Sequence, residues 1–303
     1  MKSLAIALAL LSAVALAVGT QLQNGAVDRQ RRATLIETSH LTFKQLMSLL
    51  RRPQWVSGAA ISAIALVLQF TALTLAPLIL VQPIGASALV LVAIINAKVT
   101  KTKLNQASIT AIALCTLGLG AFVLMAHEVA VEPEIDDQAL ITILSIALSL
   151  IAIFWSVLLR GATRYKPLTF IIGAGVLYGF VATLTKVVVK RLFSQGGFGR
   201  IINLEFELVT DGLTILALLS MLAAAFLGGW FVQNAYTSGP PDLVIAGLTV
   251  IDPLIAVSIG VILLNEAMNA SLMVMLGFIA SGAVAVVGVY LLSKVHPELN
   301  KPV

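Results

Sequence analysis

Charged residues and cysteine are scarce in this sequence. Only 11% of the 303 residues are Asp, Glu, Lys or Arg, whereas 59% are hydrophobic and the mean hydropathy is +1.02. Water-soluble domains carry about a quarter of their residues as charged side chains, so this composition excludes an ordinary soluble protein. The single cysteine, Cys115, rules out an intramolecular disulfide bond and argues against redox chemistry.

The residue patterns of enzymes and metal centres are also lacking. His40, His127 and His296 lie far apart in or near loops, without paired carboxylates or cysteines at metal-binding spacing. No glycine-rich loop follows a strand pattern, as a phosphate-binding loop would. We therefore expect no enzyme activity and no resident cofactor.

Long apolar stretches fill most of the chain instead. Each has about twenty residues, enough for a helix to cross about 30 Å of hydrocarbon once. Only two charged side chains, Lys186 and Asp252, lie within them. The sequence predicts an all-α polytopic protein of the cell (plasma or inner) membrane. Its nine predicted spans are Leu4–Leu22, Val56–Leu75, Leu78–Ala97, Ala107–Ala126, Ala139–Leu159, Leu168–Val189, Leu213–Val232, Leu243–Leu264 and Ala270–Leu292.

The distribution of the net charge of +5 indicates topology rather than a nucleic-acid partner. Residues 23–54 hold six Lys or Arg and two acids, whereas residues 128–137 hold five acids. The positive-inside rule places the first segment in the cytoplasm. Nine spans then put the N-terminus outside and the C-terminus inside. Lys2 and the first stretch could also form a secretory signal, but no A-x-A cleavage site follows them.

Two connecting segments have patterns of their own. Residues 41–52 repeat apolar side chains at helical spacing beside basic ones, which predicts a helix on the inner membrane surface. Residues 202–208 alternate apolar and polar side chains. This alternation predicts an extended lid pressed on the outer surface.

Part of the sequence occurs twice. Residues 71–77 (TALTLAP) return 163 positions later as residues 234–240 (NAYTSGP), and the same offset, within one residue, pairs Asn105 with Asn269 and Gly118 with Gly282. A chance match between low-complexity helices is the alternative. If the match instead reflects an internal duplication, spans two to four superpose on spans seven to nine. Five spans separate each pair, so the two copies have opposite orientations, the architecture from which alternating access follows.

The chain resembles the drug/metabolite transporter superfamily (EamA-like), and within it the nine-span NIPA-like magnesium transporters. The resemblance implies an inverted repeat on a five-plus-five plan that lacks one first-half helix, with the surface helix 41–52 in its place. Residues 1–128 would form the first half with four spans, and residues 138–303 the second half with five. The segments that carry the resemblance are Gln69-Phe70, Ala76–Ala86, Gln233–Ala235 and Leu264–Glu266.

Asp252 is the leading candidate for a binding residue. It lies near the middle of the eighth span, where a carboxylate costs roughly 2.5 kcal/mol or more to insert. Pro253 removes the helical donor to the carbonyl of Thr249. These two features predict that Asp252 binds a proton or a cation. Asp252 is also the best candidate for a metal ligand. The alternative is a neutral acid that bonds to a neighbouring helix.

Other polar residues would complete this site. Pro83 is expected to break the third span as Pro253 breaks the eighth, and Gly175 and Gly179 predict close helix packing. Spans one, three, six and eight would line a central cavity. Lys186 lies about 27 Å from the inner edge and Asp252 about 13 Å, so Lys186 is expected to snorkel outward rather than pair with it. The further candidates are Gln21, Gln69, Gln82, Tyr178, Gln233, Asn234 and Thr249.

The sequence therefore predicts a secondary transporter that moves a small polar metabolite or ion by alternating access. Leu66 and Ala97 stand where the magnesium branch carries acidic residues. Magnesium or another divalent cation is accordingly the alternative substrate, and a non-transporting membrane scaffold is a second alternative. The expected partners are the lipid bilayer, the transported substrate and a second copy of the chain.

Overall fold

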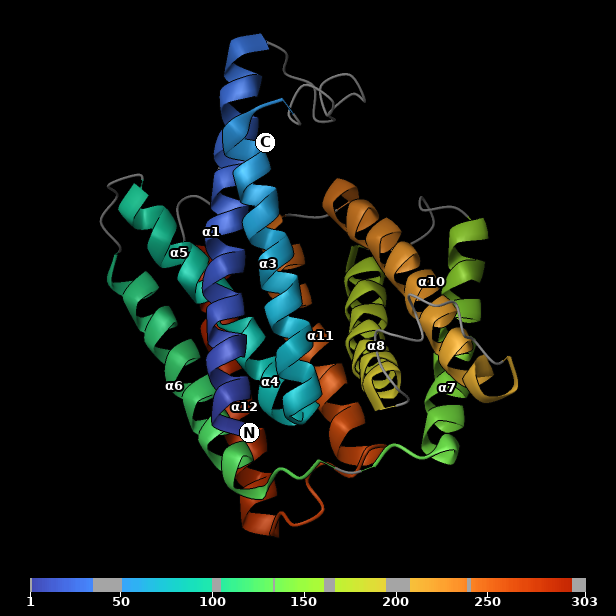
Figure 1. The fold of residues 1–303 in the computed structure, drawn as a ribbon. Coiled ribbons are helices and arrows are strands. Elements are labelled where there is room, and N and C mark those ends of the chain that lie inside the picture. The colour runs from blue at the N-terminus through green and yellow to red at the C-terminus, as the bar shows by residue number, and fades with distance from the viewer. Residues whose placement is uncertain are drawn as a thin grey trace.

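Helices make up all the regular secondary structure in the described part of the chain (Figure 1). The computed structural model describes residues 2–34, 51–99, 105–132, 134–160, 167–194, 208–238 and 241–295. The helices are α1 (Lys2–Thr34), α3 (Pro53–Leu75), α4 (Leu78–Ala86), α5 (Ala88–Val99), α6 (Gln106–Val129), α7 (Asp137–Arg160), α8 (Pro167–Ser194), α10 (Leu208–Ser238), α11 (Pro241–Ile262) and α12 (Leu272–Val295).

The predicted spans are confirmed. Nine helical stretches in the described residues are long and apolar enough to cross a membrane, with α4 and α5 together forming the third. The chain is therefore an all-α, multi-pass membrane protein. Residues 41–50 of the predicted surface helix and residues 202–207 of the predicted lid lie outside the described residues. Arg51 and Arg52 precede α3 outside any helix, and Leu208 opens α10.

The prediction that Pro83 and Pro253 break their helices is wrong. Pro83 lies inside α4 and Pro253 inside α11, which continues unbroken to Ile262. Each proline removes one helical hydrogen bond, but packing against neighbouring helices can hold the remaining ladder in place. The third span is interrupted at Ser87 instead, where the side-chain hydroxyl donates to the carbonyl of Ile84 at 2.6 Å.

Glycines bring the helices into close contact at three crossings. A Cβ atom on Gly175 would lie 2.6 Å from Cβ of Ile251, and one on Gly179 would lie 2.6 Å from Cγ2 of Ile255. The close helix packing predicted from this pair is confirmed, and the structure shows that the partner helix is α11. Gly118 similarly allows α6 to approach α12, and Gly58 allows α3 to approach α1. Small residues are the usual contact points between membrane helices because they let backbones come together.

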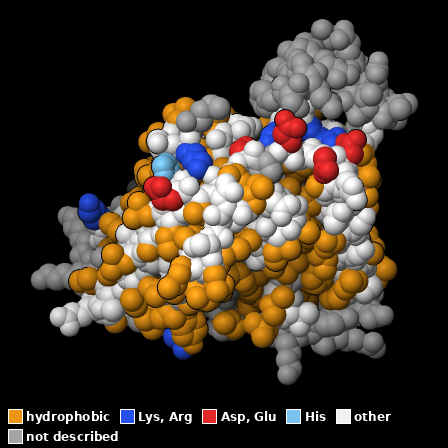
Figure 2. Space-filling model, turned by 90° about the horizontal axis from the view of Figure 1, so that it is seen from below, with side chains coloured by type: hydrophobic (Ala, Val, Ile, Leu, Met, Phe, Trp, Pro, Cys, Tyr) orange, Lys and Arg blue, Asp and Glu red, His pale blue; other side chains and the backbone are white. Residues whose placement is uncertain are grey.

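Successive spans run in opposite directions, so the connections alternate between two faces (Figure 1). We call the face that holds the start of α1 the N-terminal face. Lys2 donates from Nζ to the carbonyl of His127 at 2.9 Å, which ties the start of α1 to the end of α6 on this face. Figure 2 views the molecule from this end: acidic and basic side chains gather mainly in the upper part of the view, and most of the remaining coloured surface is hydrophobic. Lys98, at the end of α5, lies at the opposite face.

A labelling experiment tests which face points outward. A cysteine at the exposed position Glu134, on the N-terminal face, is expected to react with an impermeant maleimide added to intact cells. A cysteine at the exposed Lys98 is expected to react only after the membrane is permeabilised, because the basic connections stay inside. Both variants would carry Cys115→Ala to remove the native thiol. Labelling at Lys98 but not at Glu134 would reverse the orientation.

Candidate functional site

A cavity of about 520 Å³ lies among the spanning helices. Side chains from α1, α4, α5, α8 and α11 line it, which are the four predicted spans one, three, six and eight. Side chains of α3, the second span, line it as well; the sequence named Gln69 of this span as a site candidate but did not count the span among the walls of the cavity. The volume is within the range of small-molecule sites. Most lining residues are apolar, including Leu66, Phe70, Leu73, Leu89, Val92, Val181 and Leu248.

Asp252 is the acidic residue of this lining. The glycines of α8 position it, because they let the α11 backbone approach: Cβ atoms built on Gly175 and Gly179 would lie 3.4 Å from its amide nitrogen and 3.1 Å from its carbonyl oxygen. Its Oδ1 atom is buried and has no hydrogen-bond partner among the described residues. The neighbouring hydroxyl of Thr249 does not serve as one, since it donates to the carbonyl of Ile245 at 2.8 Å. Asp252 thus lines the cavity, and its buried Oδ1 atom has unused acceptor capacity.

Neutral polar groups share the cavity with Asp252. Gln82 of α4, Gln69 of α3 and Tyr178 of α8 all line it, as predicted, together with Thr249. Gly85 lies beside the amide of Gln69: a Cβ atom at this position would be 3.6 Å from Nε2 of Gln69, an ordinary contact distance. None of the described residues that line the cavity is Lys, Arg or His. The site therefore combines one carboxylate, two amides and several hydroxyls with apolar walls.

Three predicted residues do not line the cavity. Gln233 is exposed near the end of α10, and Asn234 donates from Nδ2 to the carbonyl of Trp230 in the same helix at 2.8 Å. Gln21 is absent from the lining, although its neighbour Thr20 belongs to it. Sequence reasoning missed Ser12, Thr20 and Thr185, which do line the cavity. Hydroxyls in apolar helices give no sequence signal of their own, because most bond to their own helix, as Thr20 does to Leu16.

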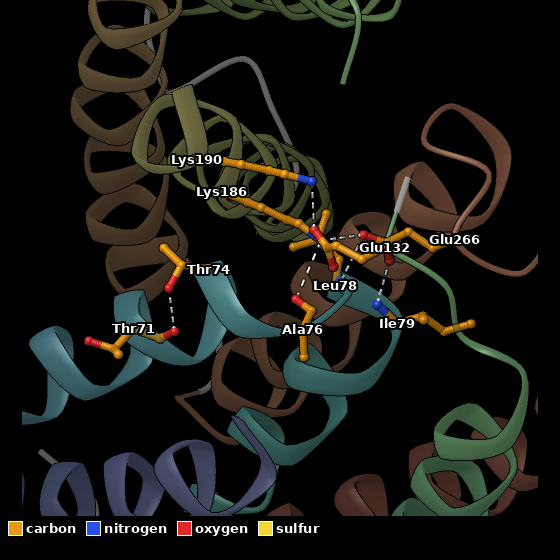
Figure 3. Close-up of polar contacts among 9 residues, drawn as sticks. All are labelled: Thr71, Thr74, Ala76, Leu78, Ile79, Glu132, Lys186, Lys190 and Glu266. Atoms are coloured by element: carbon orange, nitrogen blue, oxygen red, sulfur yellow. Dashed lines mark hydrogen bonds and ion pairs between the residues drawn. The ribbon is translucent and has the colours of Figure 1, made fainter. Parts of the chain in front are cut away.

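A second polar site lies near the N-terminal face (Figure 3). The Nζ atom of Lys186 on α8 lies 2.7 Å from Oε1 of Glu266 and 3.1 Å from Oε1 of Glu132. Lys186 is 1% exposed and Glu266 is 0% exposed. Lys190, one turn further along α8, lies 3.1 Å from Oε1 of Glu132 at the solvated edge. We call these four residues the ion cluster.

The prediction that Lys186 snorkels to the outer interface is wrong. The side chain is buried among three acceptors, because Glu266 and Glu132 approach it from connecting segments beyond the predicted spans. The expectation that it does not pair with Asp252 agrees with these contacts. Counting residues placed Lys186 toward the end of its span, but a count along one helix cannot reveal a partner 80 residues away in the chain.

Glu266 also caps a helix. Its Oε1 and Oε2 atoms accept hydrogen bonds at 2.9 Å from the backbone amides of Leu78 and Ile79, the first two residues of α4. The first amides of a helix have no partner within it, and a carboxylate there also meets the positive end of the helix dipole. Two backbone bonds fix Glu266 itself: its amide donates to the carbonyl of Gly260 at 2.9 Å, and its carbonyl accepts from Val131 at 2.8 Å.

The ion cluster therefore joins four parts of the chain that are distant in sequence. They are the α3–α4 corner, α8, the connection between α6 and α7, and the connection between α11 and α12. Asn265, which precedes Glu266, has a positive φ of 54° that turns the chain after α11 toward the bundle. Asparagine tolerates this conformation better than most residues. The segment Leu264–Glu266 drew attention in the sequence, but its contacts with α4 and α8 depend on the folded arrangement.

Comparison with known proteins gives a relative without an assigned activity. No family model and no solved structure matches the sequence. The chain is 25% identical over 263 residues to an uncharacterized protein of Corynebacterium glutamicum (strain ATCC 13032), and the match covers 87% of this chain and 85% of that protein. The match thus extends over most of both proteins, which are of similar size. The supported assignment is a multi-pass membrane protein with nine membrane-spanning helical segments in its described residues.

Proposed function

We propose that this protein is a secondary transporter that carries a small organic cation across the membrane by alternating access. The observation that carries the proposal is the carboxylate of Asp252, which lies in a membrane-depth cavity without a hydrogen-bond partner on Oδ1. An acidic group is expensive at this depth and marks a substrate or ion pathway in many membrane proteins. A cation bound in the cavity would balance the charge of this carboxylate.

The lining of the cavity favours an organic ligand with one positive charge. Asp252 is balanced by no basic residue of the lining, so a cationic ligand would neutralise the site. The amides of Gln69 and Gln82 and the hydroxyl of Tyr178 could orient polar parts of that ligand. The remaining walls are apolar and match a hydrocarbon body better than a shell of water. Aromatic faces such as that of Phe70 add cation–π attraction for an alkylammonium group.

A divalent metal fits the same cavity less well. Mg²⁺ prefers six oxygen ligands in near-octahedral geometry. The described residues contain no group of three or more His, Cys, Asp or Glu that could hold a metal ion. A magnesium ion beside Asp252 would have to keep most of its waters against apolar side chains. Magnesium transport is therefore the second candidate, and it is distinguished by the same assay.

The helix packing supports alternating access and membership of the drug/metabolite superfamily. Under the repeat proposed from the sequence, α3 corresponds to α10, α4 with α5 to α11, and α6 to α12. In keeping with it, the corresponding helices α4 and α11, and α6 and α12, contact each other. Such pairing is expected when two inverted halves, residues 1–128 and 138–303, meet at a pseudo-two-fold axis.

Counterflow into proteoliposomes tests the proposed function. Vesicles loaded with unlabelled choline or benzylamine are expected to accumulate the matching labelled amine at a rate at least about tenfold above empty vesicles, since exchange needs no ion gradient. The uncharged isosteres dimethylbutanol and benzyl alcohol are expected not to drive this exchange. Exchange of radioactive Mg²⁺ alone would favour the magnesium reading. No exchange of any probe by correctly folded protein would favour the membrane scaffold.

A further inference from the structure

We infer that the ion cluster is the gate that closes the cavity toward the N-terminal face. This inference rests on the proposed transport function, because only a transporter has to open a central cavity to each side in turn. The gate would consist of Lys186, Glu266 and Glu132, with the α3–α4 corner as the part that they hold in place. The structure would then represent the state closed on the N-terminal side.

The α3–α4 corner stands between the cavity and the ion cluster. Leu73, just before the corner, and Gln82, just after it, both line the cavity. Lys186 contacts the carbonyl of Ala76 in the corner at 3.4 Å. On α8, Thr185 lines the cavity and Lys186 directly follows it. The corner residues between them are fully buried, which leaves water no route along this part of the chain: Ala76, Leu78, Ile79, Leu80 and Val81.

Ion pairs of this kind suit a closure that has to reopen. A buried pair contributes little net stability compared with well-packed apolar residues, because both charges lose their hydration. Separating the pair lets water recover both charges, so the opened state is less unfavourable than it would be for an exposed apolar contact. A permanent connection between α4 and α8 could be made by apolar side chains alone. The buried charges are therefore better explained by a contact that breaks during use.

The cluster also contains a path from buried to hydrated partners. Lys186 lies between Glu266, which is 0% exposed, and Glu132, whose side chain is 30% exposed. Glu132 in turn pairs with Lys190, whose side chain is 29% exposed. When Glu266 moves away with the α11–α12 connection, Lys186 can keep Glu132 as its partner. Opening then replaces the buried pair of Lys186 with Glu266 by its more hydrated pair with Glu132, and Lys186 is not left without a counter-charge.

Glu266 links the gate to the position of α4. Its two hydrogen bonds to Leu78 and Ile79 hold the start of α4 against the α11–α12 connection. The corner has only Ala76 and Pro77 between two helices, and both residues have extended backbone angles. Such a short extended link can absorb a change of angle between α3 and α4. Releasing Glu266 would therefore free α4, whose Gln82 lines the cavity.

A cysteine reporter inside the cavity tests the gate. Ala182 lines the cavity one helical turn from Lys186, and cysteine there adds a single sulfur atom. The reporter would be built as Ala182→Cys with Cys115→Ala and exposed to an impermeant maleimide on the side that labels a cysteine at Glu134. Adding Glu266→Gln is expected to raise the labelling rate at least about tenfold, because the neutral amide cannot hold Lys186 in the closed position. Asp136→Asn, which changes an exposed acid outside the ion cluster, is the matched control and should leave the rate within about twofold.

Hydrogen exchange provides a second test that needs no variant. If the cluster opens and closes, amides of residues 76–82 should exchange at least about tenfold faster than those of residues 115–122 in α6, because local opening is easier than global unfolding. Equal protection of both segments, or an unchanged labelling rate in folded Glu266→Gln protein, would show a static connection and overturn the gate. Failure of the counterflow assay is a separate result. It would remove the transport function, whereas the labelling and exchange measurements would still report whether this contact opens.

Discussion

Replacing Lys186 with methionine is expected to destabilise the protein by about 3–5 kcal/mol, because the change leaves Glu266 charged and buried without its cation. Glu266 is 0% exposed, and its remaining partners are the backbone amides of Leu78 and Ile79. Methionine has a similar length to lysine, so little packing volume is lost. The free energy of unfolding would be measured by denaturant titration in detergent, with helicity as the signal.

Two further variants test whether the loss of stability comes from the unpaired charge of Glu266. Lys190→Met removes a cation of the same cluster at a partly exposed position, and it is expected to cost less than about 1 kcal/mol because surface pairs contribute little. Adding Glu266→Gln to Lys186→Met removes the stranded charge and is expected to restore part of the lost stability. If Lys186→Met unfolded at the same denaturant concentration as the unchanged protein, Lys186 and Glu266 could not form a buried ion pair.

Replacing Asp252 with asparagine is expected to weaken binding of the transported cation at least about a hundredfold, the loss for one close charge pair in a partly desolvated site. The fold should be retained, because asparagine is nearly isosteric and Oδ1 has no hydrogen bond to lose. Equilibrium binding of the amine that shows counterflow would be compared with binding of its uncharged isostere. The isostere should respond to the substitution by less than about threefold, since it makes no ion pair.

Asp136→Asn is the matched control for this substitution. Asp136 lies near the N-terminal face and accepts a hydrogen bond at Oδ1 from the amide of Ala139, at 2.8 Å, at the start of α7. Asparagine can make the same bond, so both folding and cation binding should be unchanged. Unaltered binding in folded Asp252→Asn protein would make Asp252 a packing residue and remove the basis for a cationic substrate.

Local sequence patterns were sufficient to predict the helical spans. About twenty apolar residues specify a membrane-crossing helix with little help from the rest of the chain. The same locality explains the contact made by Gly175 and Gly179, because a small-residue spacing on one helix already defines a face for close packing. The positions where the helices end were less predictable. Ser87 interrupts the third span and Pro83 does not, since neighbouring helices decide which hydrogen bonds survive.

The candidate site was predictable only where a single residue was chemically unusual. Asp252 stands out in an apolar span, and it does line the cavity. Gln233 and Asn234 had similar chemistry and a repeated segment in their favour, yet they lie elsewhere. The ion cluster was missed because its members come from a span and two connections far apart in the chain. Pairing Lys186 with Glu266 requires the relative positions of α4, α8 and α11, which one sequence does not supply.

The length of α1 carries this helix from the cavity to beyond the end of the bundle. This helix has 33 residues, or about 50 Å at 1.5 Å per residue, and it rises beyond the other helices at the face opposite the N-terminus (Figure 1). Ser12 and Thr20 line the cavity on its lower part. One continuous helix thus contributes polar groups to the wall of the cavity and also extends beyond the rest of the bundle.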